Sequence, residues 1–263
     1  MNNIKKDALI FLSFLCFGSV LSSLLRFEIF ADLINYHYYN GFSFLNNRLT
    51  YDVAPAGFHS FFNPLADTVT YLLVRTLNDR PAVYFALTGL PFGILLFVCF
   101  KINLLFFSDK RMQIVSMILA ITGFSVWSQI GTSSHEIAVS IPVLTALYFL
   151  LKEEKESWAA FLSGAAAGLK LTAMIYSMSF CILFFLFHPK DLKKIFLFIS
   201  CCIAGFLVTN GFWMYRLNDL YGNPFFPFLN AWFQSPYFEA VNFFPRMIEA
   251  PHLPYLFSFC LYC

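Results

Sequence analysis

Long apolar runs recur along this chain between short charged segments, and this pattern constrains the fold more than any other feature. A helix needs about 20 apolar residues to cross the hydrocarbon core of a bilayer. Because lipid offers backbone groups no water to bond, such runs fold as helices. The candidate spans are 8–25, 83–107, 112–130, 137–151, 159–187 and 195–213. The pattern therefore predicts an all-α polytopic membrane protein.

Composition points to the same class of protein. Hydrophobic residues make up 59% of the 263 residues, and charged residues make up 12%. Soluble domains carry about 25% charged residues, so this chain has excess apolar surface for which lipid is the natural solvent. The lipid bilayer is therefore the first expected partner. The net charge is only +2, and no basic run is dense enough to follow a phosphate backbone, which argues against a nucleic-acid partner.

The positions of lysine and arginine predict the orientation, because cytoplasmic loops are enriched in these residues. Lys5 and Lys6 place the N-terminus in the cytoplasm and segment 26–81 outside. The run 159–187 is too long for one span, and Lys170 interrupts it. Splitting the run there keeps the lysines of the next loop inside. The result is about seven spans in one transmembrane domain over 1–263, with a final outer segment 215–263.

The first outer loop, 26–81, has an unusual composition. It contains too many phenylalanines and tyrosines to be disordered. It is also too polar to span, since it contains Asp32, Asp52 and Asp67. Apolar and polar residues alternate at helical spacing over 63–77. We therefore expect amphipathic helices in this loop, lying on the membrane face.

Polar residues that are unusual beside membrane spans gather on the outer side of this topology. Ionisable groups at membrane depth are costly and are usually functional or paired. We therefore expect several of them to line one outward-facing pocket. The candidate site residues are Asp32, His37, Asn63, Asp67, Glu136, Lys170, Arg216 and Asn223, and the polar residues Asn35, His135 and Asp219 belong to the same group.

Each candidate also has a plainer structural interpretation. Asp32 is placed to cap a helix that begins at Leu33, and this reading weighs as much as a catalytic role. For His37, among tyrosines, we favour a membrane-interface residue over a metal ligand. Glu136 follows a good helix cap and is placed to complement the helix dipole. Lys170 is equally well explained by a side chain that reaches the headgroups.

Two asparagines precede prolines and signal turns first of all. These are Asn63, followed by Pro64, and Asn223, followed by Pro224. Such dipeptides favour the start of a turn. Each asparagine therefore has a structural reading beside the substrate-binding one.

Four strings together resemble the GT-C superfamily of membrane glycosyltransferases, which use polyprenyl-phosphate-linked sugars. The order of the strings and their place in the topology carry the resemblance, which runs to about residue 238. The strings are DLINYHYYNG at 32–41, DVAPAGFHSFFNPLAD at 52–67, GLKLT at 168–172 and GNPFFPFLNAWFQSPYF at 222–238.

The resemblance implies a function and a site. GT-C enzymes keep an acidic residue just after the first helix, where this chain has Asp32. That residue acts as a base on the acceptor or helps to hold a divalent metal. The resemblance also implies that Lys170 and Arg216 contact the donor phosphate. No strict Asp-Asp or Glu-x-Asp pair is present at Asp32, which leaves the use of a metal open.

The last residues of the sequence begin a further apolar run. GT-C proteins have more spans, and this chain stops eight residues into a new apolar run, 256–263. We therefore expect a truncated member of the inner membrane, completed by a second fragment.

The alternatives are a transporter or flippase for lipid-linked intermediates and a non-catalytic membrane subunit. Broken helices fit a transporter, but no inverted repeat is evident.

Overall fold

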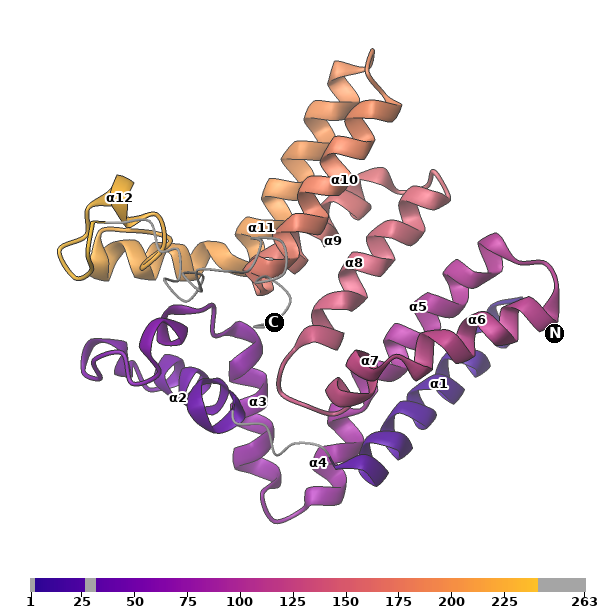
Figure 1. Cartoon of the computed structure of the whole chain (residues 1–263), viewed down its shortest axis with the longest axis horizontal. Coiled ribbons are helices and arrows are strands. Elements are labelled where there is room, and N and C mark those ends of the chain that lie inside the picture. The colour runs from indigo at the N-terminus through magenta and orange to yellow at the C-terminus, as the bar shows by residue number, and fades with distance from the viewer. Residues whose placement is uncertain (1–2, 27–31, 241–263) are drawn as a thin grey trace, which may run out of the picture. The chain divides into compact units, whose positions relative to one another are not determined.

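The computed structural model describes residues 3–26 and 32–240. Within these ranges the chain forms helices joined by turns, and no strand (Figure 1). The α-helices are α1 (Asn3–Leu25), α2 (Tyr38–Leu45), α3 (Leu65–Leu77), α4 (Pro81–Thr88), α5 (Leu90–Phe106), α6 (Lys110–Thr122), α7 (Phe124–Gln129), α8 (Glu136–Leu151), α9 (Glu156–Leu169), α10 (Met174–Phe187), α11 (Leu192–Tyr221) and α12 (Asn230–Phe233). The π-helix η1 (Leu33–His37) and three 3₁₀ helices, η2 (Arg48–Thr50), η3 (Gly57–Phe61) and η4 (Leu171–Ala173), complete the set.

The chain divides into two compact units, Met1–Trp213 and Met214–Cys263. In the second unit, two buried asparagines organise the turns that follow α11. Asn223 donates to the carbonyl of Phe228 at 2.9 Å and accepts from the amide of Phe225 at 2.9 Å. Asn230 accepts from the amide of Ser235 at 2.9 Å. The rest of the predicted final outer segment, from residue 241, lies outside the described residues.

Three helical segments in the described ranges are long and apolar enough to cross a membrane. They are Ile4–Leu25 in α1, Pro81–Phe106 through α4 and α5, and Leu192–Tyr221 in α11. Most of their apolar side chains are not covered by protein. In water such surfaces would be strongly unfavourable, whereas lipid solvates them. The prediction of an all-α protein of membrane type is therefore confirmed.

The break that the sequence predicts at Lys170 is present. Lys170 has an extended backbone, with φ −144° and ψ 116°, and it ends α9 at Leu169. The short helix η4 and α10 then continue the chain. The long apolar run 159–187 is thus two short helices joined at a charged residue.

Two predicted spans differ from the structure. The run 112–130 is divided at Gly123, whose extended backbone separates α6 from α7 and leaves α6 with 13 residues. The last span was expected to end at residue 213, but α11 continues to Tyr221. The polar residues from Arg216 onward are still compatible with helix, since propensity varies little among them. The number of seven spans stays a prediction.

Helices of the first unit surround two hydrophobic cores. One core joins α8, α9, α10 and the first part of α11, with Phe184 stacked on Phe198 at 4.2 Å. The other joins α5 and α8, with side chains of α1 and α6 against it. Small residues let α9 and α11 approach closely, because a methyl group at Gly164 would overlap the backbone of Cys202. Close contact through small residues is a common way to pack helices in membranes.

The orientation can be tested with reporter fusions at two positions. We expect a fusion after Ser60 to report the outside, because Lys5 and Lys6 predict a cytoplasmic N-terminus. We expect a fusion after Lys190 to report the cytoplasm, because that loop carries three lysines. Paired alkaline phosphatase and green fluorescent protein fusions measure the two sides. A cytoplasmic signal after Ser60, or an outside signal after Lys190, would contradict the topology.

Candidate functional site

The segment between α1 and α4, called the outer loop here after its predicted location, folds so that α2 and α3 lie against each other and present polar side chains to one point. His37, at the end of η1, and Asn40, in α2, are three residues apart and share a helix face. Asp67 lies in the first turn of α3. The two helices approach closely at Gly41, because a methyl group there would overlap the carbonyl of Asp67. This contact carries His37 and Asn40 to the Asp67 carboxylate.

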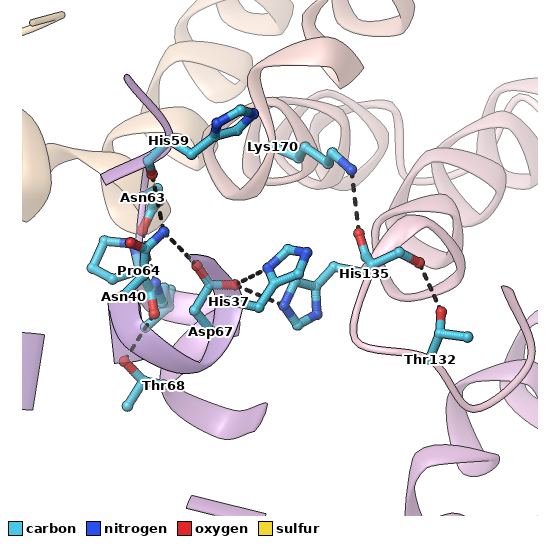
Figure 2. A network of polar contacts seen from close by, with 12 residues as sticks. His37, Asn40, His59, Asn63, Pro64, Asp67, Thr68, Thr132, His135 and Lys170 are labelled. Atoms are coloured by element: carbon cyan, nitrogen blue, oxygen red, sulfur yellow. Dashed lines mark hydrogen bonds and ion pairs between the residues drawn. The ribbon is translucent and has the colours of Figure 1, made fainter. Parts of the chain in front are cut away.

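Asp67 is the centre of a buried polar network (Figure 2). Its Oδ1 lies 2.6 Å from Nδ1 of His37 and 2.9 Å from Nε2 of His135. Its Oδ2 accepts from Nδ2 of Asn40 at 3.1 Å, and the same amide group donates to the carbonyl of His59 at 3.0 Å. His37, Asn40 and Asp67 are each less than 5% exposed. We call His37, Asp67 and His135 the His–Asp–His cluster.

His135 reaches the cluster through an unusual backbone. It stands just before α8 with φ +64°, in the left-handed region. Non-glycine residues held in sparsely populated backbone regions cost about 1–3 kcal/mol, so they persist only where their surroundings hold them. The loop before it is held by a hydrogen bond of 2.9 Å between the hydroxyls of Thr132 and Ser134. The strain therefore sits at the residue that contacts Asp67.

Burial and hydrogen bonding set the charges in this cluster. Burial raises the pKa of the Asp67 carboxyl, but the hydrogen bonds from His135 and His37 outweigh it and bring the pKa below its usual range. Burial lowers the pKa of His135, although Asp67 acts in the opposite direction. Asp67 is therefore an ionised carboxylate at neutral pH, and His135 is a neutral imidazole.

Lys170 and Glu136 form an ion pair beside the cluster. Nζ of Lys170 contacts Oε1 of Glu136 and also donates to the carbonyl of Ser134 at 3.2 Å. The side chains of Lys170 and Glu136 are 30% and 45% exposed, so solvent reaches the pair. Exposed ion pairs contribute only about 0–1 kcal/mol to stability, which leaves the ammonium group available to a ligand.

Asp32 lies close to the same network without capping a helix. It is exposed, and its side chain makes no capping hydrogen bond to η1. The pKa of the Tyr36 hydroxyl is affected by several nearby carboxylates. Burial raises the pKa of Tyr36, and the carboxylates of Asp32, Asp67 and Glu136 raise it further. Asp32 therefore acts on the same hydroxyl as Asp67 and Glu136, and convergence of these groups on one pocket stays a prediction.

The other predicted residues have structural contacts. Asn63 donates to the carbonyls of Gly168, at 2.7 Å, and Thr209, at 2.9 Å, and so ties the outer loop to α9 and α11. Asn223 is buried in the turn after α11. Arg216 also lies in the second unit. The side chains of Asn63 and Asn223 each accept a hydrogen bond from the backbone amide two residues later, as the turn interpretation predicts. Substrate binding by these residues stays a prediction.

His37 is buried against Asp67, and its position relative to the membrane surface stays a prediction. Sequence reasoning missed two residues of the network, Asn40 and His59, and it counted His135 among the polar residues of the outer side without giving it a role. Asn40 had a usable signal, because it shares a helix face with His37. His135 was recognisable as a polar residue next to a predicted cap, but nothing local pointed to Asp67.

A search among protein families, curated proteins and solved structures finds no match to this chain.

The arrangement offers three chemical functions within one region. The His–Asp–His cluster gives two imidazoles and a carboxylate whose donor atoms lie within 4.8 Å of one another. Lys170 gives a solvent-accessible cation. Asp32 gives an exposed carboxylate. These groups come from the loop after α1, from the start of α8 and from the end of α9, so only the folded first unit brings them together.

The contact at Gly41 can be tested by adding one methyl group. We expect Gly41→Ala to lower stability by about 1–3 kcal/mol, the usual cost of overpacking a well-packed contact. The clashing atoms belong to the Asp67 backbone and to Cβ of Tyr71, at 2.6 Å, and neither is a flexible side-chain end. Thermal unfolding in detergent measures the change. Gly123→Ala is the matched control, because its nearest neighbour is 3.6 Å away. Equal midpoints for the two variants would contradict the close packing of α2 on α3.

Proposed function

We propose that this protein is a GT-C type glycosyltransferase that moves a sugar from a polyprenyl-phosphate donor to an acceptor. The reaction takes place on the periplasmic face of the inner membrane, with the N-terminus in the cytoplasm. The main support is the gathering of Asp32, the His–Asp–His cluster and the Lys170–Glu136 pair around one region. The helices able to span a bilayer support this proposal, because a lipid-linked substrate is found in the membrane.

A lipid-linked donor needs a cation for its phosphate and an apolar path for its chain. Lys170 supplies the cation, since charge-assisted hydrogen bonds to phosphate are among the stronger polar contacts. A cavity of about 380 Å³ lies between α9, α10 and α11, and its lining is almost wholly apolar. Gly164, Met178, Ile203 and Phe206 are among the residues that line it. Lys170 stands at the break that joins α9 to α10, so both features share these helices.

The proposed reaction is an inverting displacement at the sugar. The acceptor hydroxyl attacks the anomeric carbon and forms a new carbon–oxygen bond. The bond from that carbon to the phosphate oxygen breaks, and polyprenyl phosphate leaves with the electron pair. Asp32 accepts the proton of the hydroxyl, as a general base. Lys170 stabilises the charge that develops on the leaving phosphate, and phosphate binding by Arg216, in the second unit, stays an expectation from the resemblance.

The other residues of the site bind and orient in this proposal. His37 and Asp67 fix the loop that carries Asp32, and Glu136 pairs with Lys170 until the donor phosphate takes its place. Asn63 holds that loop to α9 and α11. Asn223 supports the turn after α11, and Arg216 lies in α11 itself. A catalytic site needs such support, because displacements of about 1 Å reduce rates strongly.

The test is a transfer assay with a labelled donor. The purified chain in proteoliposomes is given a radiolabelled polyprenyl-phosphate hexose and a membrane extract as the source of acceptor. We expect label to leave the polyprenyl-phosphate fraction for a new product. Asp32→Asn should reduce this rate by about a hundredfold to ten-thousandfold, the usual effect of losing a general base. Asp79→Asn, an exposed residue of the same loop, is the matched control.

The outcomes distinguish the proposal from its competitors. Normal transfer by the Asp32→Asn variant would remove Asp32 from the mechanism. Donor that crosses the vesicle membrane unchanged would identify a flippase instead. A wild-type chain that neither transfers nor translocates the donor would indicate a non-catalytic subunit.

A further inference from the structure

We propose that His37, Asp67 and His135 form a binding site for a divalent transition-metal ion of the zinc class. Each residue offers one ligand atom, and these atoms all lie within 4.8 Å of one another. The residues come from η1, from α3 and from the start of α8, so the site closes only when three distant segments meet. This site differs from the metal site that the GT-C resemblance suggests, because that site would use Asp32, which is not one of the three ligands.

The ligand spacing is close to what a small ion needs. Zinc binds imidazole nitrogen at about 2.0–2.1 Å and carboxylate oxygen at about 2.0–2.2 Å, usually in tetrahedral geometry. Ligand atoms around such an ion lie about 3.4 Å apart. In the structure, Oδ1 of Asp67 lies 2.6 Å from one imidazole nitrogen and 2.9 Å from the other. Small rotations of the side chains separate these atoms enough for an ion.

A second observation points to a ligand at this place. Nε2 of His37 is buried and, within the described part of the chain, has no hydrogen-bond partner. Buried polar atoms are almost always paired, so an unpaired one calls for an explanation. One imidazole nitrogen of His37 contacts Asp67 while the other faces no acceptor or donor. The only side-chain hydrogen bond of His37 in the described part of the chain is therefore the one that joins its Nδ1 to the cluster, so no other hydrogen bond explains a buried histidine at this position.

The surroundings of the cluster are those of a supported metal site. Residues behind metal ligands commonly orient them through hydrogen bonds. Asn40 does this for Asp67, since its amide group donates to Oδ2 at 3.1 Å and leaves Oδ1 for the cluster. The left-handed backbone of His135 is a further sign, because strained residues concentrate at functional sites.

The ligand set selects the class of metal. Magnesium and calcium prefer oxygen ligands, whereas imidazole suits zinc and its first-row neighbours. Three protein ligands leave a coordination position open, as in catalytic rather than structural zinc sites. When bound, such an ion supplies a Lewis acid for an oxygen of a substrate. Metal binding itself does not depend on the proposed sugar transfer.

The test measures metal on the intact chain, without any assay of activity. The protein is purified in detergent without a polyhistidine tag, treated with a chelator and dialysed against micromolar Zn²⁺. We expect about one zinc per chain by mass spectrometry of the metal. A parallel sample with Co²⁺ should show visible absorption bands of cobalt bound to imidazole. The variants His37→Gln, Asp67→Asn and His135→Gln should each lose the bound ion.

Two further variants sharpen the result. His188→Gln changes a histidine far along the chain, in the loop after α10, and should keep full metal content. Asn40→Ala keeps all three ligands and should weaken zinc binding by about 10–100-fold, the usual effect of removing an orienting partner. Circular dichroism and size-exclusion chromatography establish that each variant is folded.

Three results would overturn the proposal. The first is a wild-type chain without stoichiometric zinc and without a cobalt spectrum. The second is a folded ligand variant that binds as much zinc as wild type. The third is an equal loss of zinc in the His188→Gln control. In the first case the cluster is a hydrogen-bonded network only.

Discussion

Replacing Asp67 by alanine is expected to lower the thermal midpoint more than any other single change in the outer loop. A carboxylate only accepts hydrogen bonds, so both imidazole nitrogens that contact it carry hydrogen. The substitution leaves these two buried donors without an acceptor, at about 1–3 kcal/mol each. For a chain of this size that corresponds to a midpoint lower by about 5–15 °C. Unfolding in detergent with a chelator measures it independently of any metal.

Two comparisons make this prediction specific. Asp79→Ala removes an exposed aspartate from the same loop and should leave the midpoint unchanged. Asp67→Asn keeps one acceptor oxygen and should fall between the alanine variant and wild type. If Asp67→Ala unfolds at the same temperature as Asp79→Ala, the network does not hold the loop together.

The second large effect is expected for Lys170→Met in donor binding. The substitution keeps the apolar stem of the side chain and removes the ammonium group. A hydrogen bond to a charged group contributes about 1.5–3 kcal/mol, so the Michaelis constant for the polyprenyl-phosphate donor should rise by about 10–150-fold. The stability should change little, because the pair with Glu136 is partly exposed to solvent. Initial rates over a range of donor concentrations measure the effect.

Glu136→Gln separates phosphate binding from a merely structural ion pair. If Lys170 binds the donor, loss of its internal partner should leave the Michaelis constant equal or lower. If the pair is only structural, both single variants should lose activity alike, and the double variant should recover it. That second pattern would contradict a role in phosphate binding. Lys190→Met, an exposed lysine in the loop after α10, is the matched control.

Lys170 both ends α9 through its backbone and contacts the start of α8 through its side chain. Its extended backbone ends α9, and its side chain returns to Ser134 and Glu136 at the start of α8. Glu136 adds negative charge at the N-terminal end of α8, where the helix dipole favours it. Both readings of Glu136 from the sequence, dipole partner and site residue, are therefore compatible with its position in the structure.

The sequence by itself determined the parts of this protein that depend on local periodicity. Apolar runs predicted α1, the span through α4 and α5, and α11, because the bilayer demands length and apolarity within one segment. A lysine inside an overlong run predicted the break at Lys170. Helical spacing over 63–77 predicted α3. Gly123 shows the limit of this reasoning, because one extended residue divides an otherwise continuous run.

Only the tertiary structure decided which polar residues meet. His37 and Asp67 are 30 residues apart, and His135 is 68 residues from Asp67. Asn63 reaches across 105 residues to Gly168. Such pairs leave no local pattern, because they depend on how α2, α3, α8 and α9 pack in space. The charge and polarity of a residue are known from the sequence. The residues that it contacts depend on how the helices pack.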